Sequence, residues 1–125
     1  MAVDINFTIS SADIIDRFQL SSDFVNGRAQ SDLEELVEKG VYVVVPIGDA
    51  DYICNYKGTL AIFNTLQYSK GQQFANTDFA SLIVNGSTVG LVRQLDNLAF
   101  LIVFEASHLI AGDQRKSQGL FYLSL

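Results

Sequence analysis

The chain has 125 residues, of which 49% are hydrophobic and only 18% charged, a composition that excludes an intrinsically disordered polypeptide. Its formal net charge of −6 at pH 7 argues against nucleic acid or anionic membranes as partners, since both require clustered lysine and arginine. Length and composition together predict a single domain over residues 1–125 with one hydrophobic core.

The N-terminal part changes its hydrophobic period along the chain. The segment "VDINFTIS" (residues 3–10) alternates apolar and polar side chains, which predicts a half-buried strand. In "SSADIIDRFQL" (residues 10–20) the apolar residues recur at helical spacing behind a serine that can cap the helix. A strand followed by a short helix is therefore predicted.

A second helix is predicted over residues 31–40, "SDLEELVEKG". Ser31 and Glu34 have the spacing of a capping box at the start of a helix. Lys39 and Gly40 have the residue types that favour the end of one.

From residue 41 onward the patterns are those of strands and turns. Asn85-Gly86 is a strong signal for a two-residue hairpin, which would place Val84 opposite Ser87 and Leu82 opposite Val89. Residues 69–78 and 107–119 are polar and are predicted to be loops, the second with at most a helical turn. The predicted strands cover residues 41–47, 51–56, 59–68, 79–84, 87–92, 98–106 and 120–125.

These elements predict an α+β fold with one N-terminal strand and two short helices, followed by a mainly antiparallel sheet of about six strands. The sheet would either stay open or curl into a barrel or sandwich, and the helices would cover one of its faces. Pro46 lies inside "VYVVVPI" (residues 41–47) and has no N–H to donate, so this strand is predicted at a sheet edge.

Candidate catalytic groups are few, because His108 is the only histidine and Cys54 the only cysteine. A nucleophilic triad would have to use His108, yet no Gly-x-Ser-x-Gly motif is present to supply its serine. Two Cys and His ligands are too few for an ordinary zinc site, and no phosphate-binding glycine motif is present. The single cysteine excludes an internal disulfide.

Three carboxylates are candidate site residues. Glu105 directly follows the apolar run "LAFLIVF" (residues 98–104), so partial burial could make it a general acid beside His108. The competing interpretation, which we favour, places Glu105 at the strand end, paired with Arg93, Arg115 or Lys116. Asp49 and Asp51 form a D-x-D pair after a strand that could bind Mg²⁺, but their Gly-Asp-Ala-Asp sequence is explained equally by a turn, which we favour.

We expect the apolar surface to exceed what one small domain can bury, which favours self-association. The C-terminal strand and the edge strand around Pro46 would form the contact between subunits. The predicted interface residues are Tyr42, Val44, Pro46, Leu120, Phe121, Tyr122, Leu123 and Leu125.

The leading functional prediction is accordingly a non-enzymatic structural protein that self-associates, in composition similar to phage or virus assembly components such as those of a virion or tail. The first alternative is a small acidic immunity or inhibitor protein, whose helices over residues 11–39 would bind a basic partner through Glu34, Glu35 and Glu38. The second is a small hydrolase using Glu105 and His108. We expect no cofactor, no metal, and no nucleic-acid or membrane partner. With no signal peptide recognised, the protein would be soluble and cytoplasmic where synthesised, or part of a virion.

Overall fold

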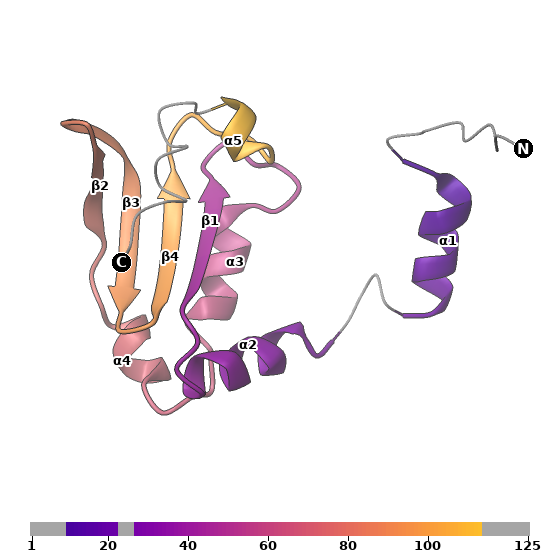
Figure 1. Cartoon of the computed structure of the whole chain (residues 1–125), viewed down its shortest axis with the longest axis horizontal. Coiled ribbons are helices and arrows are strands. Elements are labelled where there is room, and N and C mark those ends of the chain that lie inside the picture. The colour runs from indigo at the N-terminus through magenta and orange to yellow at the C-terminus, as the bar shows by residue number, and fades with distance from the viewer. Residues whose placement is uncertain (1–9, 23–26, 114–125) are drawn as a thin grey trace, which may run out of the picture.

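The computed structural model describes residues 10–22 and 27–113. It has an α+β architecture with a four-stranded mixed sheet (Figure 1). The helices are α1 (Ala12–Leu20), α2 (Ala29–Glu38), α3 (Tyr56–Phe63), α4 (Gly71–Ala75) and α5 (Ile110–Asp113). The strands are β1 (Val43–Gly48), β2 (Ala80–Val84), β3 (Ser87–Leu95) and β4 (Leu98–Val103).

The sheet has the order β1-β4-β3-β2, and β1 lies parallel to β4 while the other two pairings are antiparallel. The prediction that the Pro46 strand lies at an edge is confirmed for the described sheet, where β1 pairs on one side only. The parallel pairing was not anticipated, and it brings the carboxyl ends of β1 and β4 to the same end of the sheet, next to α5 (Figure 1).

Strand β4 is the centre of the core, and all six of its residues are buried. The side chains of Leu98, Phe100 and Ile102 pack against residues from α2, from α3 and its following turn, and from α4. The expectation that the two predicted N-terminal helices cover one face of the sheet is confirmed for α2 only, because α1 has no buried residue and the other helices of the cluster, α3 and α4, were not predicted. The buried members of this cluster are Val37, Phe63, Leu66, Phe74, Leu98, Phe100 and Ile102.

Both N-terminal helices form, although α2 begins earlier than predicted. The Ser31 hydroxyl donates to the Arg28 carbonyl inside the first turn, so Ser31 does not cap the helix and the predicted capping box is wrong. The predicted end is confirmed: Lys39 is the C-cap, and Gly40 follows at a φ of 79°.

Residues 51–68 were predicted as two strands, and this is wrong. Asn55 caps α3 by accepting the Gly58 N–H at 2.9 Å. Leu60 and Phe63 then lie at helical spacing against the core. The predicted loop over residues 69–78 likewise contains α4. The sheet therefore has four described strands instead of about six.

The predicted hairpin is present, with Val84 opposite Ser87. A register shift between Leu82 and Ile83 then places Leu82 opposite Gly90 instead of Val89. The predicted strands over residues 3–10 and 120–125 lie, apart from Ser10, outside the described residues. Among the described helices, none is long and apolar enough to cross a membrane.

Candidate active site

The end of β1 and the loop after β4 are held tightly together. The Asp49 N–H donates to the Val103 carbonyl at 2.9 Å, and the Ala50 N–H donates to the Ala106 carbonyl at 3.0 Å. A Cβ atom placed on Gly48 would lie 2.1 Å from the Ala106 carbonyl oxygen, so only glycine permits this approach. The two segments that follow β1 and β4 are thereby fixed side by side.

Asp51 lies at the centre of this junction with 7% of its surface exposed. Its Oδ1 accepts the backbone N–H groups of Ile53 and Cys54, each at 2.9 Å. The hydrogen bond from the Cys54 N–H is the largest cause that lowers the pKa of Asp51, and the bonds from His108 and Ile53 act in the same direction against burial. Asp51 is therefore an ionised carboxylate at neutral pH.

His108 lies on the loop after β4 and bonds to the other oxygen of the same carboxylate. Its Nδ1 is 2.9 Å from Asp51 Oδ2, and 56% of its side chain is exposed. Because an ionised carboxylate only accepts hydrogen bonds, Nδ1 carries the proton in the neutral ring and Nε2 keeps a free lone pair. The exposed ring can therefore act as a base toward a second group.

The loop that carries His108 is closed by Asp113 at the end of α5. Asp113 Oδ2 accepts the Ser107 N–H at 2.8 Å and also the Ser107 hydroxyl. The Gly112 and Asp113 N–H groups donate to the Leu109 carbonyl at 2.8 and 3.2 Å. These bonds fix the residues on both sides of His108.

Beside His108 is a hollow of about 520 Å³. It is lined by Pro46 of β1 and by His108 and residues 109–112, so its lining is mostly apolar. Leu109 has 73% of its surface exposed at this position. A ligand that contacts the exposed side of the imidazole would therefore meet an apolar surface.

The sequence suggested that Glu105 acts beside His108, but in the structure the carboxylate bonded to His108 is that of Asp51 and not that of Glu105. Glu105 is exposed, adopts a φ of 55°, and forms no ion pair with the described residues. Asp49 is also exposed, while Asp51 is buried, so the two carboxylates of the D-x-D pair do not form one site. The turn interpretation of Asp51 accounts for the bonds to Oδ1 and leaves its bond to His108 unexplained.

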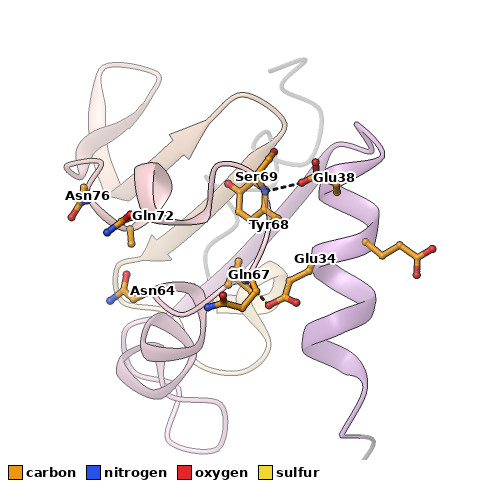
Figure 2. Close-up of a pocket in the computed structure, with 11 residues that line it drawn as sticks. Glu34, Glu38, Asn64, Gln67, Tyr68, Ser69, Gln72 and Asn76 are labelled. Carbon is orange, nitrogen blue, oxygen red and sulfur yellow. Dashed lines mark hydrogen bonds between the residues drawn. The ribbon is translucent and has the colours of Figure 1, made fainter.

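The acidic side chains of α2 line a second, larger hollow of about 990 Å³ (Figure 2). Glu34 accepts the Gln67 N–H at 2.7 Å and Glu38 accepts the Ser69 N–H at 2.8 Å, while Glu35 pairs with Lys39. Figure 2 shows Glu34 and Glu38 turned toward the loop that follows α3. The acidic face suggested for a basic partner is thus bonded to its own chain.

Of the predicted interface residues, Tyr42 and Val44 are 69% and 43% exposed at the β1 edge. Pro46 lines the hollow beside His108. Residues 120–125 lie outside the described part, and self-association through this set stays a prediction.

A buried carboxylate bonded to an exposed imidazole is the arrangement that hydrolases with a Ser-His-Asp triad use to activate serine. The family model for serine carboxypeptidases matches residues 2–122, and the chain belongs to that family.

Similar proteins come from fungi and yeast. Carboxypeptidase S1 homolog B of Arthroderma otae is 35% identical over 109 residues, covering 86% of this chain and 17% of that protein. Carboxypeptidase S1 of Penicillium janthinellum is 38% identical over 78 residues, covering 62% of this chain and 18% of that protein. The solved structure of Kex1(Δ)p, a prohormone-processing carboxypeptidase from Saccharomyces cerevisiae, matches with a TM-score of 0.62 at 27% identity, covering 73% of this chain and 21% of that one. This chain thus spans less than a quarter of the length of these relatives.

Family membership overturns several sequence predictions. The non-enzymatic structural protein and the virus assembly component are wrong, because the relatives are carboxypeptidases. The predicted cytoplasmic or virion localisation is wrong for the same reason. Membership of a carboxypeptidase family also replaces the alternative of a small acidic immunity or inhibitor protein. The hydrolase alternative named the reaction class that the family indicates, but the carboxylate bonded to His108 is Asp51 and not Glu105.

Proposed function

We propose that this chain supplies the acid–base half of a serine carboxypeptidase active site, with His108 as the general base and Asp51 as its partner. The single observation that carries the proposal is the 2.9 Å contact between His108 Nδ1 and the buried carboxylate of Asp51. These residues come from two segments 57 positions apart, so their contact is a product of the fold. The family relationship supplies the reaction class.

In the proposed reaction a serine hydroxyl attacks the carbonyl carbon of the last peptide bond of a substrate. His108 takes the hydroxyl proton and then delivers it to the leaving amine, which releases the C-terminal amino acid. Water then attacks the acyl-enzyme, His108 again takes and returns a proton, and the shortened peptide leaves. Asp51 keeps the ring in the reactive tautomer and stabilises the imidazolium that forms twice in each cycle.

The nucleophile is proposed to lie outside the described part of this chain. Within residues 10–22 and 27–113, the side-chain bond of His108 is with Asp51, and no serine hydroxyl bonds to the imidazole. Ser107 is adjacent in sequence, but its hydroxyl donates to Asp113. Relatives several times longer than this chain have room for the remaining catalytic groups.

The test is release of the C-terminal amino acid from N-blocked dipeptides by the protein that contains the complete site. A substrate with a free carboxylate should be cleaved, and the same dipeptide with an amidated C-terminus should be a poor substrate. Replacing His108 by alanine should lower kcat by about 10⁶-fold, and Asp51→Asn by a factor on the order of 10⁴.

Asp49→Asn is the matched control, since Asp49 is an exposed carboxylate in the same turn. It should leave kcat unchanged. Full activity in His108→Ala, or equal cleavage of the free and amidated substrates, would contradict the proposal.

A further inference from the structure

Three different metal-ligating side chains converge at the junction of β1 and β4. One carboxylate oxygen of Asp51, the Sγ of Cys54 and one imidazole nitrogen of His108 all lie within 4.8 Å of one another. Asp51 is buried, while Cys54 and His108 are exposed. The cluster is therefore reachable from solvent on the side of the thiol and the imidazole.

The backbone at Cys54 is fixed by the same carboxylate that orients His108. Asp51 Oδ1 accepts the Cys54 N–H, and Asp51 Oδ2 contacts His108 Nδ1, both at 2.9 Å. Asn55, the next residue, caps α3 by accepting the Gly58 N–H. Cys54 is thus held between a buried carboxylate and the start of a helix. Its backbone therefore loses little conformational freedom when a ligand binds.

The donor set suits a borderline-soft divalent cation. Zn²⁺ binds thiolate at about 2.3 Å and imidazole or carboxylate at about 2.0–2.2 Å, so its ligand atoms lie roughly 3–4 Å apart. Rotation of the exposed Cys54 and His108 side chains can bring the cluster within that range. A thiolate and a carboxylate also balance the charge of the cation while the imidazole stays neutral.

We propose that Asp51, Cys54 and His108 form an inhibitory binding site for Zn²⁺ or Cd²⁺, with a fourth position left to water. The thiol loses its proton to solvent as the sulfur–metal bond forms. One ring nitrogen of His108 coordinates the metal through its lone pair. A metal at Nε2 occupies the base directly, and a metal at Nδ1 moves the ring proton to Nε2. In both cases His108 can no longer accept a proton from a nucleophile.

The site is tested by titrating the 125-residue chain with CdCl₂ and following the thiolate-to-cadmium charge-transfer absorption in the ultraviolet. Wild type should bind one Cd²⁺, and Cys54→Ser should lose the absorption completely. His108→Gln should keep the thiol and weaken binding by about tenfold to a hundredfold, and Asp51→Asn should do the same. Asp49→Asn is the control and should bind like wild type.

Equal Cd²⁺ affinity in wild type and His108→Gln would overturn the proposal, because it would show binding by the thiol alone. Absence of the absorption in wild type would overturn it too. Circular dichroism of wild type and of each variant establishes that the chain is folded, so that a loss of Cd²⁺ binding is assigned to the missing ligand. The readout does not involve hydrolysis, so loss of the proposed carboxypeptidase activity would leave a positive cadmium result intact.

In a protein with measurable activity, ZnCl₂ should inhibit peptide hydrolysis, and a chelator should reverse the inhibition. Cys54→Ser should then need about tenfold or more Zn²⁺ for the same inhibition, because one of three protein ligands is lost. Equal sensitivity of Cys54→Ser and wild type would place the inhibiting ion elsewhere and contradict the site.

Discussion

Asp51 has two separate tasks at opposite oxygens of one carboxylate. Oδ1 closes the turn after β1 by accepting the N–H groups of Ile53 and Cys54, and Oδ2 orients His108. The turn therefore fixes the position of His108, the proposed general base, without any ligand present. Preorganisation of this kind is what lets an imidazole act as a base without reorganising during the reaction.

The Asp51 carboxylate should make the stability of the fold depend on pH. Its folded-state pKa is lowered, chiefly by the Cys54 N–H, below an unfolded-state value of about 3.9. Ionised Asp51 therefore stabilises the fold above that value, and this contribution is lost as pH falls through the folded-state pKa. We expect Asp51→Asn to be less stable than wild type at about pH 6 and the difference to shrink toward about pH 2.

Urea unfolding followed by circular dichroism at several pH values measures this difference. Other carboxylates with lowered pKa values, such as Asp113 and Glu38, remain in both proteins and cancel in the comparison. A difference that stays constant from neutral to acidic pH would contradict the assigned bonds of Asp51.

Gly48 allows the segments that follow β1 and β4 to lie close together. A Cβ at this position would meet the Ala106 carbonyl oxygen at 2.1 Å, so backbone must move in Gly48→Ala. We expect a loss of about 1–3 kcal/mol in the free energy of unfolding, as for overpacked interiors, together with displacement of His108. Urea denaturation measures the first effect, and the NMR signals of the imidazole report the second.

Gly58→Ala provides the matched control for Gly48→Ala. Its Cβ would make an ordinary contact, 3.4 Å from Asn55 Oδ1, in the first turn of α3. Alanine favours a helix over glycine, so this variant should be as stable as wild type or gain up to about 1 kcal/mol. If both variants lose stability equally, the close approach at Gly48 is not the cause.

At the scale of elements, the parallel pairing of β1 with β4 creates the site. Parallel neighbours end at the same edge of a sheet, so residues that follow each strand meet there. Asp51 follows β1 and His108 follows β4, and each was identifiable as a polar group after an apolar strand. The missing piece was strand order, because a mainly antiparallel sheet gives no reason for those two ends to meet.

The elements that the sequence predicted well are those with strong local signals. The β2–β3 hairpin has Asn85-Gly86, with φ values of 51° and 77° that suit these two residues, and α2 ends at Gly40. Helix α3 was missed because its apolar residues also fit a strand pattern, and its cap at Asn55 was not recognised. Local sequence thus determined turns and helix ends better than it separated a short buried helix from a strand.

The bonds of Asp113 to Ser107 should position the loop that carries His108. Asp113→Asn keeps the shape of the side chain but removes the charge that accepts both Ser107 donors. In the catalytically complete protein we expect kcat to fall by up to about 100-fold with KM little changed, since misplacing the base affects the chemical step more than binding. Steady-state kinetics measure the two constants separately.

Glu105→Gln is the control for this loop, because Glu105 is exposed and has no ion pair among the described residues. It should leave both constants unchanged. If Asp113→Asn raises KM while kcat is retained, Asp113 supports substrate binding and not the position of His108.

At the scale of the whole molecule, the chain matches only part of the length of its carboxypeptidase relatives. It spans 17% of a relative to which it is 35% identical, and the described residues hold a bonded aspartate and histidine without a serine bonded to the imidazole. Composition could not reveal this, because low charge and a large apolar surface are shared by oligomeric proteins and by segments that pack against the rest of an enzyme. That ambiguity led to the incorrect prediction of an assembly protein.

The most direct test of the acid–base pair is the rate at which an organophosphorus fluoridate labels the catalytic serine of the complete protein, with mass spectrometry to locate the label. We predict one labelled serine, outside the described residues, and labelling slowed by about 10³-fold or more in His108→Ala. Asp49→Asn should be labelled at the wild-type rate. Labelling that is equally fast without His108, or a labelled serine within the described residues, would contradict the assignment of His108 and Asp51 as the acid–base pair.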